Sequence, residues 1–217
     1  MVSPLFHKWL NRGNRDVHGM KKIPLFVMIL LLLGAMGAIE ACDAPLVNVD
    51  SLSGSTRVYY MNDILRKSRT GLSAPDEAKL VTVIIDESHA YRVDPLLVMA
   101  MIKTESTYYN WARSYKGAMG LMQIMPPTGR WVAGEIDLEW DGDDILYDPY
   151  TNVRLGIHYF SALKQRYEDN LELTLAAYNA GPTRLSSLMR RGRALPRVYA
   201  GKVLDNYREL KQMEGYL

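Results

Sequence analysis

The chain has 217 residues, of which 48% are hydrophobic and 23% are charged. These ordinary values exclude a mostly disordered chain, a collagen-like chain and a multi-span membrane protein, and the length suits one compact domain with an appendage. The formal net charge is +2, but residues 1–42 hold five of the basic and two of the acidic side chains, which leaves 21 basic and 22 acidic ones in residues 43–217. That balance excludes a general nucleic-acid binder by charge.

The first 42 residues have the pattern of an export signal. Residues 23–39 carry no charge and follow two lysines, and a basic flank before an apolar run is typical of a signal peptide or a signal anchor. Cys42 comes just after this run, as in a bacterial lipoprotein signal, although Glu40 stands where such signals usually have a small residue. Lipidation at Cys42, an uncleaved membrane anchor and ordinary signal cleavage are three alternatives. Each one exports the rest of the chain to the periplasm or cell envelope.

Residues 43–74 are expected to be a linker with a short helix. Residues 43–56 are rich in Ser, Asp, Pro and Gly and show no period that would bury a face. A helical stretch is expected over residues 58–69, with Tyr60, Ile64 and Leu65 on one side.

Residues 75–217 are expected to form an all-α domain. Asp94-Pro95 and Asp148-Pro149 are typical helix starts, with an N-cap residue before a first-turn proline. Residues 96–102 are apolar on every side, as in a helix buried in a core. Periodicity and these start signals predict helices over residues 76–91, 95–105, 149–167, 171–179, 182–190 and 196–213. No convincing alternating strand pattern is found, and the domain is long enough for one core.

Glu105 stands at the carboxyl end of the apolar helix. The residues three and four positions before it are Ile102 and Met101, so its face of the helix is apolar. Loss of solvation and the negative end of the helix dipole both raise the pKa of a carboxyl in this position. A carboxylic acid that stays protonated near neutral pH is what a glycosidase needs as its general acid. The alternative is a surface glutamate at a frayed helix end, which the helix pattern alone favours.

Two segments downstream favour the functional interpretation. Residues 117–126 are dense in Gly and Met, and glycines let a backbone approach a ligand closely. Residues 176–182 end a helix with Tyr178 and Asn179, whose hydroxyl and amide groups can hydrogen-bond sugar hydroxyl and acetamido groups. Taken singly, the first segment is more often a packed turn and the second a glycine-terminated helix.

Together these segments resemble the catalytic domain of the soluble-type (SLT) lytic transglycosylases, a family of lysozyme-like enzymes. The resemblance covers roughly residues 90–207. It is carried, in family order, by Glu105-Ser106, Gly120-Leu121-Met122-Gln123, Asp148-Pro149 with Asn152 and Gly156, Ala177-Tyr178-Asn179-Ala180-Gly181, and Tyr199 with Val203-Leu204. The residues before Tyr199 depart from the pattern, because the family often has an acidic residue and a threonine there. This departure leaves the detailed role of Tyr199 open.

The resemblance implies a lysozyme-like fold and a peptidoglycan lytic transglycosylase. Such enzymes cleave the β-1,4 bond between N-acetylmuramic acid and N-acetylglucosamine without water and leave a 1,6-anhydro end. By resemblance, Glu105 protonates the leaving oxygen and then takes the proton of the muramoyl 6-hydroxyl. The absence of any Asp or Glu between Glu105 and Glu135 agrees with a scheme that uses one carboxylate. The resemblance implies these substrate-binding residues, with Tyr178 holding or tuning the Glu105 carboxyl: Ser114, Gln123, Met125, Tyr178, Asn179 and Tyr199.

No cofactor and no metal are expected. Cys42 is the only cysteine, and the four histidines lack the spacing of metal ligands. A calcium-loop pattern starts at Asp137, but its twelfth position is Asp148 and not the bidentate Glu that such a loop needs. The basic run at residues 190–193 is interpreted as a solvated helix end, with a contact to an anionic glycan as the alternative.

The expected partners are the peptidoglycan glycan strand, a membrane through the N-terminal segment, and an unidentified cell-envelope assembly. Nucleic acid is not expected. Two other functions remain as alternatives: a goose-type lysozyme activity, in which water replaces the 6-hydroxyl, and a glycan-binding domain without turnover. The presence of Glu105, Gln123 and Tyr178 disfavours the binding domain.

Overall fold

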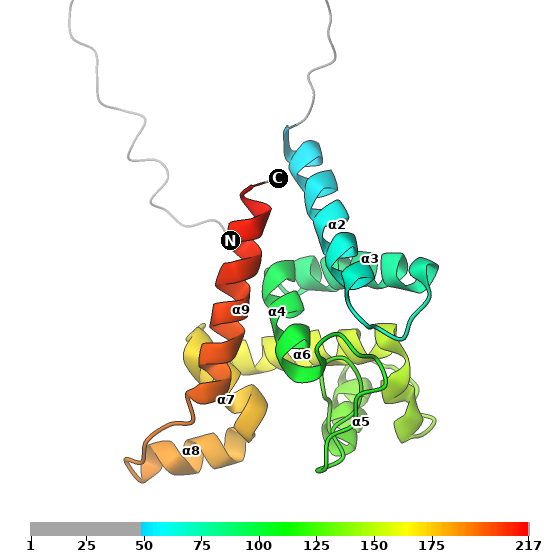
Figure 1. Cartoon of the computed structure of the whole chain (residues 1–217). Helices are drawn as coiled ribbons and strands as arrows, with labels where there is room; N and C mark the ends of the chain where they lie inside the picture. Colours follow the sequence, from blue (N-terminus) through cyan, green and yellow to red (C-terminus); the bar gives the residue numbers. More distant parts are fainter. Residues whose placement is uncertain (1–48, 217) are drawn as a thin grey trace, which may run out of the picture. The chain divides into compact units, whose positions relative to one another are not determined.

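The computed structural model describes residues 49–216, all within one compact unit, and these residues are mostly helical (Figure 1). The elements are α2 (Val49–Lys67), α3 (Ala74–Ala90), α4 (Pro95–Ser106), α5 (Pro126–Glu135), the 3-10 helix η2 (Asp143–Tyr147), α6 (Pro149–Arg166), α7 (Leu171–Ala180), α8 (Pro182–Arg190) and α9 (Val198–Glu214). In this part of the chain β-structure is limited to isolated bridges around Met119, which confirms the all-α class.

The expected export signal, with residues 1–42 and Cys42, lies outside the described residues. Within residues 49–216, no helix has the length and apolar character needed to cross a bilayer.

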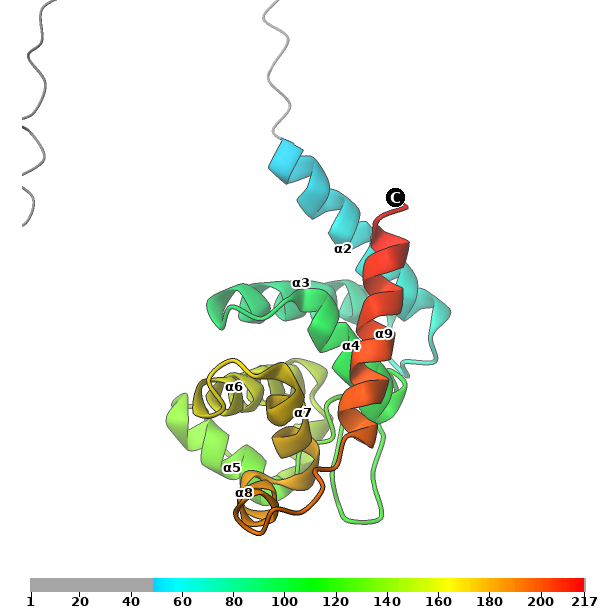
Figure 2. The same ribbon diagram turned by 90° about the vertical axis from the view of Figure 1, so that its left-hand side faces the viewer.

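α4 lies at the centre of the fold. The Asp94 side chain accepts a hydrogen bond of 2.9 Å from the Leu96 N–H, and Pro95 occupies the first turn, so the helix starts where the sequence predicts. Residues 95–102 are all buried, as expected of a helix that is apolar on every side. α9 packs along α4, and α3 packs against both α4 and α6 (Figures 1 and 2).

The predicted helices over residues 149–213 correspond to α6–α9, with ends that agree within two residues. α6 begins at a second local start signal, because the Asp148 side chain accepts a hydrogen bond of 2.7 Å from the Thr151 N–H. Two elements, α5 and η2, were not predicted. α5 has two internal glycines, Gly129 and Gly134, and its N-cap residue Met125 makes no side-chain cap, so its sequence lacks the usual local signals.

Residues 43–74 contain a longer helix than the short one expected within a linker. α2 begins at Val49, nine positions before the expected start at Val58. Tyr60, Met61 and Leu65 on this helix are buried in the main core, with exposures of 7%, 0% and 1%. The helix therefore packs as part of the folded body, which its polar and glycine-containing first turns do not indicate.

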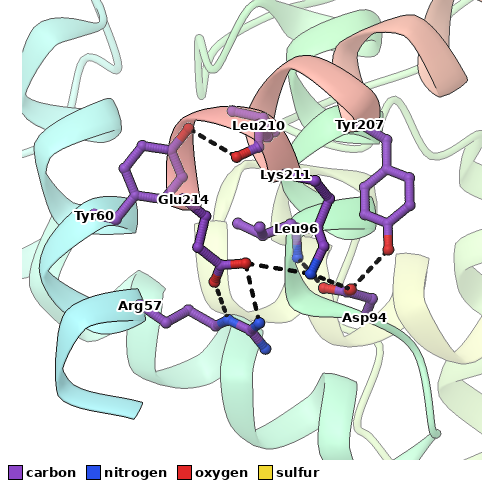
Figure 3. Close-up of polar contacts among 8 residues, drawn as sticks. All are labelled: Arg57, Tyr60, Asp94, Leu96, Tyr207, Leu210, Lys211 and Glu214. Atoms are coloured by element: carbon purple, nitrogen blue, oxygen red, sulfur yellow. Dashed lines mark hydrogen bonds and ion pairs between the residues drawn. The ribbon is translucent and has the colours of Figure 1, made fainter. Parts of the chain in front are cut away.

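A polar network fastens α2 and α9 to the start of α4 (Figure 3). Arg57 of α2 pairs with Glu214 of α9, and the Tyr60 hydroxyl donates to the Leu210 carbonyl over 3.2 Å. Two side chains of α9 contact Asp94 at the start of α4. The Tyr207 hydroxyl donates a hydrogen bond of 2.7 Å to the Asp94 carboxylate, and Lys211 Nζ lies 3.8 Å from the same carboxylate. These contacts fix the carboxyl end of α9, and the amino end of the same helix carries Tyr199.

Candidate active site

The predicted site residues converge on one cavity of about 620 Å³. Its walls come from the end of α4, the loop that follows it, the start of α5, the middle of α6 and the α7–α8 junction. Six of the seven predicted site residues line it: Glu105, Ser114, Gln123, Met125, Tyr178 and Asn179. Tyr199 is not part of the lining, but it acts on Glu105 as described below.

Glu105 is the next-to-last residue of α4, and the helix stops there because Thr107 and Tyr108 adopt left-handed backbone conformations with φ of 52° and 67°. The side chain is partly buried and makes no ion pair with any described residue. Burial raises the pKa of the Glu105 carboxyl from its ordinary value of 4.5 to about 7. The carboxyl therefore holds its proton near neutral pH, as a general acid must.

Tyr199 acts on the same carboxyl from the second position of α9. Hydrogen bonding from its hydroxyl lowers the pKa of Glu105, against the larger effect of burial. The contact is loose, because the Tyr199 hydroxyl has no acceptor at full hydrogen-bonding geometry among the described residues. Catalytic hydrogen bonds are often long in a ligand-free site and tighten when substrate binds. Burial and the neighbouring Glu105 raise the pKa of Tyr199 well above its ordinary value, so it remains a donor.

The Tyr178 hydroxyl bonds to the backbone in this structure, and the neighbouring Glu105 adds to burial in raising the pKa of Tyr178 well above its ordinary value, so its role in holding or tuning the Glu105 carboxyl stays a prediction. Its hydroxyl donates a hydrogen bond of 2.9 Å to the Met122 carbonyl, and its ring packs 5.4 Å from Tyr159 and 6.2 Å from Phe160, centre to centre. The side chain is 9% exposed. Tyr178 therefore braces the turn over residues 120–123, and Tyr199 is the tyrosine whose hydroxyl lowers the pKa of Glu105.

The loop that follows α4 is held by its own polar groups. The Ser114 hydroxyl accepts a hydrogen bond of 2.9 Å from the Ala118 N–H, and this contact closes the loop tip. The Gln123 amide donates to the carbonyls of Ala112 (3.1 Å) and Gly120 (2.9 Å), with Gln123 itself at φ of 49°. Ser114 and Gln123 thus shape the cavity wall as well as lining it.

Asn152 on α6 anchors this loop to the core. It accepts a hydrogen bond of 2.7 Å from the Met122 N–H and donates to the carbonyls of Met119 (3.0 Å) and Leu146 (2.9 Å), fully buried. Gly120 adopts φ of 77°, and a Cβ there would lie 2.3 Å from the Asn152 amide and from the Leu146 carbonyl oxygen. Only glycine fits this position, for reasons of both backbone conformation and space.

Met125 and Asn179 line the cavity as exposed side chains, Met125 being 39% exposed. The structure adds lining residues that the sequence analysis did not select, among them Tyr159, Lys116 and Arg184. Tyr159 lies within a long amphipathic helix, and its sequence offers no signal that separates it from a core aromatic. The basic run at residues 190–193 is not part of the lining.

The acidic residues of the calcium-loop pattern do not gather into a metal site. In the described part of the chain, no three His, Cys, Asp or Glu side chains come together in a way that could hold a metal ion.

The domain is all-α, and one partly buried carboxyl lies in a cavity between a glycine-rich loop and a helix junction. These features place the fold in the lysozyme-like class. The chain belongs to the transglycosylase SLT domain family, whose sequence model matches residues 82–197, more than half of the chain. Tyr199 and the whole of α2 and α9 lie outside the matched range.

Relatives and solved structures agree with this assignment. The chain is similar to the soluble lytic murein transglycosylase of Salmonella typhimurium (36% identity, 40% of this chain, 14% of the relative). It is also similar to membrane-bound lytic murein transglycosylase C of Mannheimia succiniciproducens (30% identity, 48% of this chain, 31% of the relative). The crystal structure of an inactive mutant of lytic transglycosylase Slt from Pseudomonas aeruginosa superposes with a TM-score of 0.55 at 28% identity, over 61% of this chain and 24% of that one. The similarity thus spans less than a third of each of these proteins.

Proposed function

We propose that this protein is a peptidoglycan lytic transglycosylase that cleaves the β-1,4 bond between N-acetylmuramic acid and N-acetylglucosamine without water, with Glu105 as acid and then as base. The observation that carries the proposal is the Glu105 carboxyl, which lines the cavity with a pKa raised to about 7 by burial. Membership of the SLT family and the names of the lytic murein transglycosylases that it resembles support the same activity.

The proposed chemistry uses one carboxyl twice. The protonated Glu105 donates its proton to the glycosidic oxygen as the bond from that oxygen to the muramoyl anomeric carbon breaks. The 6-hydroxyl of the same muramoyl residue then attacks the anomeric carbon, and the Glu105 carboxylate takes the hydroxyl proton. Glu105 ends protonated, as it began, and the product carries a 1,6-anhydro ring.

The charges around Glu105 support this sequence of steps. No cation contributes to the pKa of Glu105, so the carboxyl is not held permanently ionised. Hydrogen bonding from Tyr199 favours the ionised form, which must exist briefly after the first proton transfer. A pKa near 7 suits a group that both gives and accepts a proton at neutral pH.

The proposal places the protein in the cell envelope, where peptidoglycan is found. The apolar run at residues 23–39 supports export, and the name of a relative, membrane-bound lytic murein transglycosylase C, supports attachment to a membrane. Residues 1–42 would supply that attachment, with Cys42 as the lipidated residue if the signal is of the lipoprotein type. Incorporation of radiolabelled palmitate would test lipidation, and its absence from the wild-type protein would exclude it.

The activity is tested by digesting purified peptidoglycan sacculi and weighing the released muropeptides. We expect 1,6-anhydro-muramoyl products from the wild-type protein and none from Glu105→Gln, which keeps the shape of the side chain but cannot transfer the proton. Circular dichroism of both proteins checks that the variant is folded. Products heavier by one water would identify a lysozyme, and full activity of Glu105→Gln would remove Glu105 from the mechanism.

A further inference from the structure

Two cations line the cavity that holds Glu105. Lys116 comes from the loop after α4 and Arg184 from the first turn of α8, and both side chains are exposed. Both ribbon views show this loop and α8 projecting from the same end of the molecule (Figures 1 and 2). Glu105 is the one carboxyl among the described residues that form this lining, so the rim carries positive charge that the cavity itself does not balance.

Neither cation is neutralised by an acidic side chain among the described residues. Among residues 49–216, Lys116 has its ammonium 5.4 Å from the centre of the Tyr115 ring, and neither Lys116 nor Arg184 forms an ion pair or a side-chain hydrogen bond. Neither one acts on the Glu105 carboxyl, whose pKa responds only to burial and Tyr199. The two cations are therefore available to a ligand at the rim and do not serve the reacting carboxyl.

The backbone presents both side chains from fixed positions. Lys116 stands at the loop tip that Ser114 closes. The Ser114 hydroxyl accepts a hydrogen bond of 2.9 Å from the Ala118 N–H, and the Ser114 carbonyl accepts one of 3.0 Å from the Gly117 N–H. Arg184 directly precedes Leu185, which is fully buried and fixes the first turn of α8. A ligand that spans the mouth of the cavity would meet a positive charge on each of these two elements.

The proposed substrate has anions in only one of its parts. Its glycan strand offers neutral hydroxyl and acetamido groups, whereas the peptide stems on the muramoyl residues carry free carboxylates. We propose that Lys116 and Arg184 bind the carboxylates of the peptide stem, so that the site selects glycan strands whose stems are present and ionised. This inference rests on the proposed function and adds a substrate preference to it.

The test compares two substrates that differ only at the stem carboxylates: a glycan tetrasaccharide bearing peptide stems with free carboxylates, and the same compound with those carboxylates converted to neutral methylamides. We expect the wild-type protein to show a higher kcat/KM for the acidic compound. Lys116→Gln and Arg184→Gln should each reduce that preference by about two- to fivefold, as expected of partly exposed ion pairs. The preference should shrink in 1 M salt, because the Debye length there is about 3 Å and exposed charges are screened from one another.

Arg190→Gln is the matched control, since Arg190 is an exposed arginine on the same helix outside the cavity. It should leave the preference unchanged. Equal rates on the two substrates, or an equal loss on both in Lys116→Gln and Arg184→Gln, would overturn the inference while the proposed function stands. Failure to cleave either substrate would count against the proposed function itself, and a preference that Arg190→Gln also removes would point to general attraction by positive charge and overturn the inference.

Discussion

Two opposing influences set the proton affinity of the Glu105 carboxyl. Burial favours the neutral acid and is the larger influence, and hydrogen bonding from Tyr199 favours the carboxylate. The balance leaves the pKa at about 7, close to the pH at which the proposed acid and base steps are both feasible. Tyr199 therefore sets where on the pH scale Glu105 works, and this makes the role of Tyr199 measurable.

Tyr199→Phe should move the alkaline limb of the pH profile of kcat/KM to higher pH. The hydroxyl of Tyr199 lowers the pKa of Glu105, so its removal raises that pKa, and the acid form survives at higher pH. Release of muropeptides across pH 5–9 would measure the shift. Tyr207→Phe makes the same change on the same helix, but the Tyr207 hydroxyl contacts Asp94 at the far end of α4. The alkaline limb of the pH profile of this variant should therefore match that of the wild-type protein. An unmoved limb in Tyr199→Phe would show that the two side chains are not coupled.

The helix α6 supports the site through one side chain. Asn152 makes three hydrogen bonds to backbone groups of the loop and of η2, and it is fully buried. A backbone group left buried without a partner costs about 1–3 kcal/mol. Asn152 thus holds the turn that carries Gln123 against the core, although Asn152 is not part of the cavity lining.

Asn152→Ala should lower the free energy of unfolding by about 2–3 kcal/mol, because the Met122 N–H loses its partner and the carbonyls of Leu146 and Met119 each lose a donor, although the Met119 carbonyl keeps the Ile124 N–H. It should also reduce activity, since the turn over residues 120–123 loses its anchor. Asn206→Ala is the control, because Asn206 makes a single hydrogen bond, to Thr104 at 2.9 Å, and should cost about 1 kcal/mol. Urea unfolding measures both values. Equal costs for the two variants would mean that Asn152 does not anchor the loop.

The helix starts of α4 and α6 could be predicted from sequence because a capping aspartate and a first-turn proline act through adjacent backbone groups. The burial of α4 could be predicted from its uninterrupted apolar run. The extent of α2 could not, because contacts that hold this helix, such as Arg57 with Glu214, join residues far apart in the sequence, and the residues before Val58 carry no helix-start signal. The approach of Tyr199 to Glu105 likewise depends on how α9 packs against α4, and no local pattern encodes that packing.

The burial of Glu105 makes the free energy of unfolding of the whole domain depend on pH. Its pKa in the folded protein, about 7, is above its ordinary value of 4.5, so the folded state binds this proton more tightly than the unfolded state. The resulting stability is complete below about pH 4.5 and is lost as the pH rises through about 7. Above that pH the protein must hold a desolvated charge, which a neutral side chain of the same shape would avoid.

Glu105→Gln should therefore be more stable than the wild-type protein at pH 8, and this advantage should shrink by about 2–3 kcal/mol between pH 8 and pH 5. For a domain of this size, that change corresponds to roughly 4–12 °C in Tm. Thermal melts of the two proteins at both pH values measure the difference, and the other titrating groups cancel because they are common to both. Glu135→Gln, at an exposed glutamate of α5, is the control for replacing a carboxyl by an amide outside the cavity. If the Glu105→Gln advantage were the same at both pH values, the carboxyl would not be desolvated in the folded protein, and the basis for its role as a proton donor at neutral pH would be lost.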